Sequence, residues 1–68
     1  MRITISLYQD PDVEVELQKI DVFGEPRRWR INTIIDGQVN VIPYPATAET
    51  EAHEAYDRIV SKRLEAIR

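Results

Sequence analysis

The stretch "TAETEAHEAYDRIVSKRLEAI", residues 47–67, decides the fold because its apolar residues recur at the spacing of one helical face. Glutamates lie near its start and basic residues near its end, which favours the helix dipole. Thr47 is the expected N-cap, so we predict one helix over residues 47–67. The apolar stripe comprises Ala52, Ala55, Tyr56, Ile59, Val60, Leu64 and Ile67.

The residues before this helix alternate between apolar and polar, as strands do. We predict strands at about residues 2–8, 13–23, 28–35 and 38–43, separated by turns at "QDPD", "FGEP" and Asp36–Gly37. The apolar phase shifts by one after Gln18, which predicts a β-bulge near Gln18–Lys19. The predicted fold class is α+β: a four-stranded antiparallel β-meander with one C-terminal α-helix packed on one face (ββββα), in a single domain of residues 1–68.

The last hairpin allows two registers. A two-residue loop pairs Ile34 with Val39 and places Asn40 beside Thr33. A three-residue loop, with Gly37 in a bulge, pairs Thr33 with Val39 and puts the valines on the core face. We predict the three-residue loop, because it separates apolar from polar residues more cleanly.

This reading assigns the strand residues to two faces. The face under the helix includes Ile3, Ile5, Leu7, Val15, Ile31, Val39 and Val41. The uncovered face is predicted to hold Arg2, Thr4, Ser6, Tyr8, Glu14, Glu16, Arg28, Arg30, Asn32, Ile34, Gln38, Asn40, Ile42 and Tyr44.

The composition is that of an ordinary globular domain, with 43% hydrophobic and 31% charged residues. The chain has no cysteine, which gives no sign of an oxidising compartment, and no apolar run of membrane-spanning length. The N-terminus lacks the apolar core of a signal peptide, so we expect a cytoplasmic protein. The net charge of −3 argues against nucleic-acid binding, although "RRWR" (residues 27–30) is a basic spot in an acidic molecule.

Catalytic groups are scarce. The single histidine, His53, has Glu49 and Asp57 one helical turn to either side, a spacing that could hold a metal or act in base catalysis. A solvated helix face explains the same pattern, and "HEAYD" lacks the second histidine of a zincin. We therefore predict no enzyme, no catalytic residue, no metal and no cofactor, and retain metal-dependent activity at His53 as a third reading.

Two surfaces are candidates for binding. On the uncovered face we expect a partner-binding patch of Arg28, Arg30, Asn32, Tyr44, Glu14 and Glu16, because arginine and tyrosine are enriched at interfaces. The first strand is free of proline and nearly free of charge, so it invites pairing with a partner strand or a second copy. The residues expected to pair at that edge are Ile3, Thr4, Ile5, Ser6 and Leu7.

Residues 27–66 resemble the plant ethylene-response-factor (Apetala-two-like) DNA-binding domain. The family has a Thr-Ala-Glu helix start leading to Ala-Tyr-Asp, as in "TAETEAHEAYD", and a tryptophan-bearing hairpin before the helix, as in "RRWRINTIIDGQVNVIP". Its sheet lies in the DNA major groove. The resemblance implies DNA contacts by Arg27, Arg28, Trp29 and Arg30. The helix here has one extra residue before Tyr56, and the acidic "VEVELQKIDVF" stands where the family has a basic strand.

Taken together, these observations predict a small non-enzymatic protein that binds a macromolecular partner, foremost a protein, through the open face or an edge of its sheet. In size, acidity and lack of catalytic groups it looks like the small phage-encoded inhibitors of the anti-CRISPR type. The alternative is a DNA-binding domain that uses the Arg-Trp hairpin.

Overall fold

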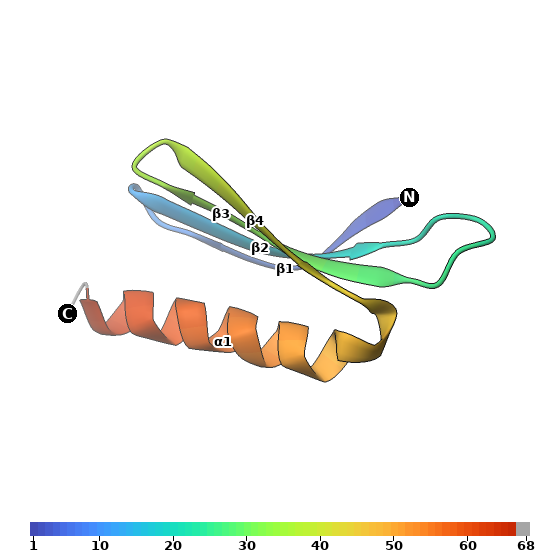
Figure 1. Cartoon of the computed structure of the whole chain (residues 1–68). Coiled ribbons are helices and arrows are strands. Elements are labelled where there is room, and N and C mark those ends of the chain that lie inside the picture. The colour runs from blue at the N-terminus through green and yellow to red at the C-terminus, as the bar shows by residue number, and fades with distance from the viewer. Residues whose placement is uncertain (67–68) are drawn as a thin grey trace.

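A computed structural model describes residues 1–66. Within these residues the chain forms four strands, one 3₁₀ turn and one long helix (Figure 1). The elements are β1 (Arg2–Gln9), β2 (Val13–Ile20), β3 (Arg28–Ile35), β4 (Gln38–Tyr44), η1 (Ala46–Ala48) and α1 (Glu49–Ala66). The sequence reading placed all four strands and the helix; Ile67, the last residue of the predicted helix, lies outside the described residues.

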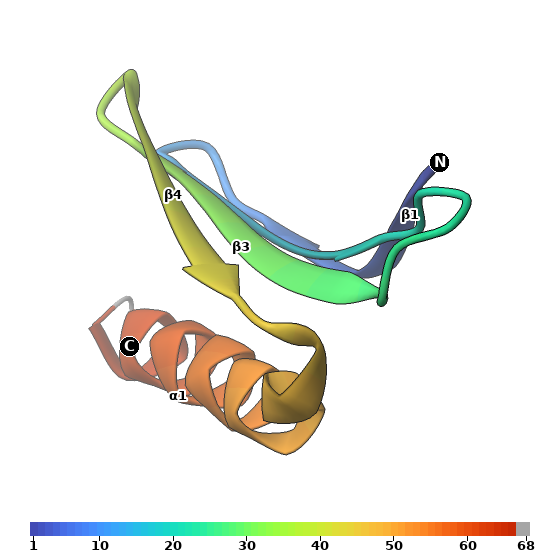
Figure 2. The same ribbon diagram turned by 45° about the vertical axis from the view of Figure 1, so that its right-hand side comes forward.

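The strands form one antiparallel sheet in the order β1-β2-β3-β4, and α1 packs across one face of it (Figure 1). This is the predicted ββββα meander. The sheet curves away from α1 at both ends, so its other face is concave (Figures 1 and 2). We call this uncovered side the open face.

The core lies between α1 and the two central strands. Leu17, Ile31 and Val15 have no solvent exposure and form its centre. Ala52 is also fully buried, since a small side chain lets the helix approach the sheet closely. Tyr56 and Trp29 close the sides of the cluster. Towards the C-terminal end the predicted stripe leaves the core, and Leu64 is exposed.

The β3–β4 turn corrects the predicted register. Asp36 has φ 51° and Gly37 has φ 80°, so both residues are left-handed, as a two-residue type I′ turn requires. Ile34 pairs with Val39, and Thr33 pairs with Asn40. The three-residue loop was wrong because the twist of the type I′ turn matches that of the strands, and this outweighed clean polar segregation.

The register turns β4 over relative to the prediction. Val39 and Val41 now point to the open face, where they are 64% and 50% exposed. The opposite set of side chains, predicted to be uncovered, lies on the helix side of the sheet. That set comprises Asn40, Ile42 and Tyr44, together with Gln38.

A β-bulge is present, but in β1 rather than near Gln18–Lys19. Ser6 pairs with Leu17 and Thr4 with Gln18, which leaves Ile5 as the extra residue. A bulge reverses the side-chain phase. Ser6 and Tyr8 therefore lie on the helix side and Leu7 on the open face, contrary to the prediction. Ile3 stays on the helix side but is partly exposed beside Lys19.

Two element boundaries also differ from the prediction by more than one residue. β2 ends at Ile20 because a turn follows, in which Glu25 N–H donates to the Val22 carbonyl and Gly24 has φ 83°. The predicted N-cap, Thr47, instead lies inside η1, and the helix begins at Glu49.

Candidate functional site: the open face of the sheet

The open face gathers residues from all four strands. Its rows follow from the pairing register, since directly paired residues share a face. We call the end of the sheet that carries the β1–β2 and β3–β4 turns the hairpin end. From this end inward, the rows are Gln9, Glu14, Ile34 and Val39; then Leu7, Glu16, Asn32 and Val41; then Thr4, Gln18, Arg30 and Pro43; and last Arg2, Ile20 and Arg28.

Apolar side chains collect on the β3–β4 side of this face. Ile34, Val39, Val41 and Pro43 occupy adjacent positions, and we call them the valine patch. All except half-buried Ile34 are exposed. A shallow hollow between the two hairpin turns adjoins the patch and is lined by Gln9, Pro11, Asp12, Glu14, Ile34 and Gly37. The patch lies outside the core cluster, so it presents apolar surface to water.

A hydrogen-bonded polar row crosses the middle of the open face. Gln18 is only 3% exposed, and its Oε1 accepts hydrogen bonds from Arg30 Nε (2.9 Å) and Nη2 (2.6 Å). Gln18 Nε2 donates to Glu16 Oε1 (2.7 Å), and the Thr4 hydroxyl donates to Glu16 Oε2. The row holds Arg30 and Glu16 in place. Beside it, Asn32 Oδ1 is buried without a hydrogen-bond partner among the described residues.

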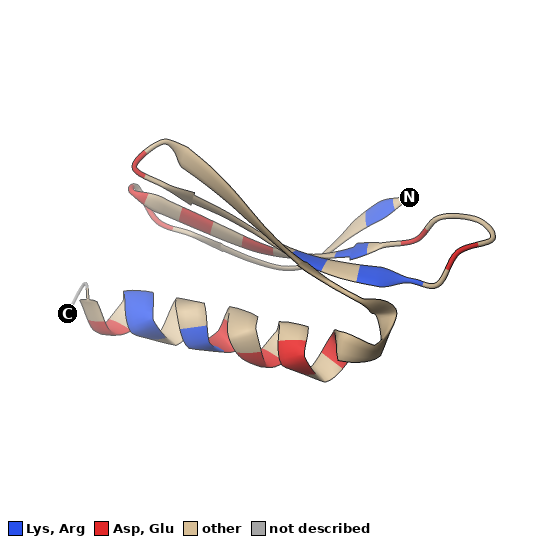
Figure 3. Cartoon of the chain, in the orientation of Figure 1, with Lys and Arg blue, Asp and Glu red and all other residues tan. Residues whose placement is uncertain are grey.

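Charge is separated along the sheet (Figure 3). Glu14 and Glu16 lie towards the hairpin end, and Arg28 and Arg30 towards the opposite end. At the basic end, Arg30 donates to the neutral amide oxygen of Gln18, and Arg28 Nη2 lies 3.8 Å from Glu25 Oε2. Arg27 also has an acidic neighbour, with its Nε 4.0 Å from Asp21 Oδ2. Among residues 1–66, no Lys or Arg side chain lies within ion-pair distance of Glu14 or Glu16.

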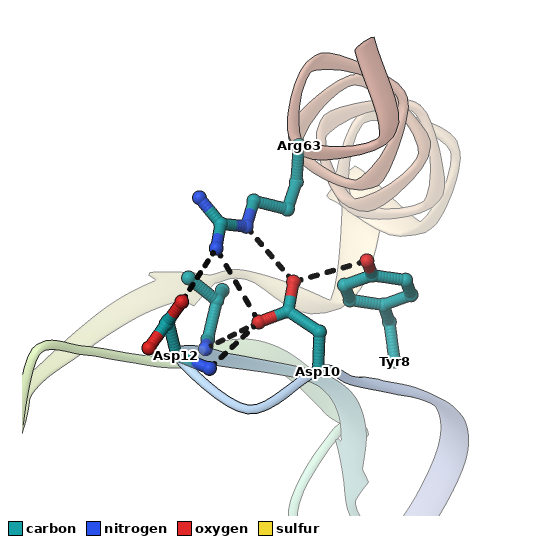
Figure 4. A network of polar contacts seen from close by, with 5 residues as sticks. Tyr8, Asp10, Asp12 and Arg63 are labelled. Carbon is teal, nitrogen blue, oxygen red and sulfur yellow. Dashed lines mark hydrogen bonds and ion pairs between the residues drawn. The ribbon is translucent and has the colours of Figure 1, made fainter. Parts of the chain in front are cut away.

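The aspartates of the β1–β2 turn stabilise the fold by binding Arg63 of α1 (Figure 4). Arg63 of α1 donates to Asp10 Oδ2 (2.8 Å) and lies 3.6 Å from Asp12 Oδ2. Asp10 Oδ1 also accepts hydrogen bonds from the Asp12 and Val13 N–H groups, as an Asx turn does. Chiefly because of the Arg63 hydrogen bond, the pKa of Asp10 is well below its ordinary value. Burial, and then the hydrogen bond to Asp10, raise the pKa of Tyr8. This clamp fixes the C-terminal part of α1 to the turn.

The open face brings together five of the six predicted partner-binding residues, namely Arg28, Arg30, Asn32, Glu14 and Glu16. The sixth, Tyr44, lies on the helix side and is partly buried against the core. Trp29, predicted to contact DNA, is also buried there, with its ring 5.3 Å from that of His53. The Arg-Trp hairpin therefore does not present its tryptophan and arginines on one surface.

Three other expectations concern metals and edges. Among residues 1–66, no group of three or more His, Asp or Glu side chains could hold a metal ion. His53 instead lies beside Trp29. β1, which carries the predicted edge-pairing residues, is an edge strand of the sheet.

Sequence reasoning missed several residues that the structure places on exposed surfaces or in the polar row. Val39 and Val41 were assigned to the core, and buried Gln18 was taken as the site of a bulge. Phe23 was read only as part of a turn, yet its side chain is fully exposed in the β2–β3 loop, beside exposed Val22. An aromatic residue within a turn sequence was the available signal for Phe23.

No family model, curated protein or solved structure matches the chain. The resemblance to the ethylene-response-factor domain therefore stays a prediction. Within the described part of the chain, no helix is both long and apolar enough to cross a membrane.

Proposed function

We propose that this chain is a non-enzymatic binding protein whose open face contacts another protein. The observation that carries the proposal is the valine patch, which is uncovered and borders the carboxylates of Glu14 and Glu16. Contiguous exposed apolar surface beside charged residues is typical of protein-interaction sites. The partner we infer brings an apolar anchor to the patch and basic groups to the two glutamates.

A protein partner suits the open face better than DNA does. DNA affinity depends on neutralising phosphates with free Lys and Arg side chains. Arg30 already donates to Gln18, Arg28 lies at ion-pair distance from Glu25, and Glu14 and Glu16 would face the phosphates. The net charge of −3 adds further repulsion.

The proposal is tested with two matched double variants. Glu14→Lys/Ile34→Thr changes the open face, and Glu54→Lys/Leu64→Thr makes corresponding changes at exposed positions of α1. Each variant, immobilised after circular dichroism has verified its fold, captures proteins from its native cell lysate for quantitative mass spectrometry. We expect the open-face variant to lose the specific partner by roughly tenfold or more, as at an interface hot spot, while the helix variant retains it.

Equal capture by both variants would contradict the role of the open face. Binding to labelled duplex DNA would favour the alternative function if it weakened steeply with salt and was lost in Arg28→Ala.

A further inference from the structure

The outer edge of β4 lacks the usual protection of an edge strand. β4 ends the sheet, and its sequence "QVNVIPY" contains no charged residue. Natural edge strands are commonly blocked by charges, bulges or proline, because their unpaired backbone groups can bind another strand. Here the only such device is Pro43, near the end of the strand. Figure 2 shows the hairpin end of β4 standing clear of α1.

The register determines which backbone groups of β4 point outward. In a two-residue hairpin the pair that flanks the turn, Ile35 and Gln38, is hydrogen-bonded, and bonded pairs then alternate along the ladder. By this alternation Val39 and Val41 direct their N–H and C=O groups away from β3. Pro43 has the same parity, which suits a residue without an N–H.

The opposite edge, β1, is less suited to pairing. Its bulge at Ile5 breaks the alternation of outward groups in the middle of the strand. A regular strand added to β1 would lose register at that point. The segment Val39–Asn40–Val41 has no such interruption.

We propose that β4 pairs with β4 of a second copy of this chain, antiparallel and centred on Asn40. Val39 of each copy then lies opposite Val41 of the other, and the outward groups of both valines bond across the axis. The segment Val39–Asn40–Val41 has the same residue on either side of Asn40, so the same edge can serve as both partners of an antiparallel pair. Although each chain carries a net charge of −3, β4 contains no charged residue, so the paired strands bring no like charges opposite each other.

Asn40 specifies this register. It is exposed on the helix side of the sheet and would face Asn40 of the second copy at a non-hydrogen-bonded pair, where side chains come closest. The two amides can hydrogen-bond to each other. The same pairing brings the valine patches of both copies side by side on the open face. This inference uses the backbone edge of β4 and does not depend on the proposed partner of the open face.

The test replaces Asn40 with charges of either sign. We measure molar mass by sedimentation equilibrium from micromolar to millimolar concentration, against a monomer mass of 7.9 kDa. Wild type is expected to approach twice that mass. Asn40→Lys and Asn40→Glu each place like charges opposite each other and should raise the dimer Kd roughly tenfold or more. An equimolar mixture of the two variants should dimerise again. Gln38→Lys, on the same strand and face, does not meet its own kind and should leave the Kd nearly unchanged.

Two results would overturn the inference. One is a wild-type mass of 7.9 kDa at every concentration. The other is a wild-type dimer whose Kd is the same in both Asn40 variants, which would place the contact elsewhere, such as at β1. Val39→Pro is a second test: it removes the outward N–H of residue 39 without removing a hydrogen bond to β3, and should also give a monomer. An intact circular dichroism spectrum verifies that this variant is folded.

Discussion

Val15 and Val41 provide a direct test of the register, because the same substitution is available on opposite faces of the sheet. Val15 is fully buried in the core, whereas Val41 is 50% exposed on the open face. Changing either valine to alanine removes the same two methyl groups. The difference between the two variants therefore reports mainly how deeply each position is buried and packed.

The expected magnitudes follow from burial. Removing the buried methyl groups of Val15 costs about 1.6 kcal/mol in transfer free energy, and the cavity raises the loss to about 2–3 kcal/mol. Val41 loses about 0.8 kcal/mol, since half of its surface is wet in the folded state and no closed cavity forms. A chain of this size has a free energy of unfolding of roughly 3–10 kcal/mol, so Val15→Ala approaches the limit of stability.

Urea unfolding is a suitable assay, and the single tryptophan, Trp29, is a suitable probe because its side chain is buried. Both variants should shift the midpoint without changing the m-value. In thermal unfolding, Val15→Ala should lower Tm by about 10–20 °C and Val41→Ala by about 3–6 °C. If the two substitutions cost the same, Val41 belongs to the core, the three-residue loop is restored, and the valine patch does not exist.

Three further predictions test the turns and the polar contacts. Asp10 has a lowered pKa in the folded chain, so its stabilising effect is complete above the ordinary Asp pKa of about 3.9 and is lost as pH falls towards the folded pKa. Asp10→Asn should therefore weaken the loss of unfolding free energy at acidic pH, whereas Asp12→Asn, at a more exposed side chain, should leave that loss unchanged. Gly37→Ala should destabilise by about 1 kcal/mol in urea unfolding, because φ 80° is unfavourable for any side chain; no loss would argue against the type I′ turn. Gln18→Ala should lower the free energy of unfolding by about 1–3 kcal/mol, because it removes a buried hydrogen-bond acceptor. Gln38→Ala, at an exposed side chain, should change it little, and equal effects of the two variants would contradict the polar row.

The element order could be predicted because it depends on local periodicity. Alternation in residues 2–8 and 13–17 and the helical stripe after Thr47 leave few other ways to bury one apolar side of each element. The same reasoning identified Glu14, Glu16 and Arg30 as open-face residues, since β2 and β3 are regular strands whose alternation is unbroken. These central strands also carry most of the core.

The two edge strands could not be predicted because their phase depends on single residues. In β1, the strict alternation of "RITISLY" contains no sign that Ile5 is skipped by the ladder. In β4, choosing the cleaner segregation assumed that the uncovered face is polar. The left-handed Asp36 and Gly37 set the opposite phase. Both errors placed apolar residues in the core that the structure exposes.

These errors share a direction, and that direction bears on function. Both edge strands turn apolar side chains, Leu7 in β1 and the valines in β4, to the open face, where the isolated chain gains little from them. Local rules most often fail where a sequence meets a requirement other than folding. Burying the exposed remainder of Val39 and Val41 against a partner would contribute about 2 kcal/mol, or roughly thirtyfold in affinity. The residues that misled the folding argument are thus the ones with the most binding free energy to contribute.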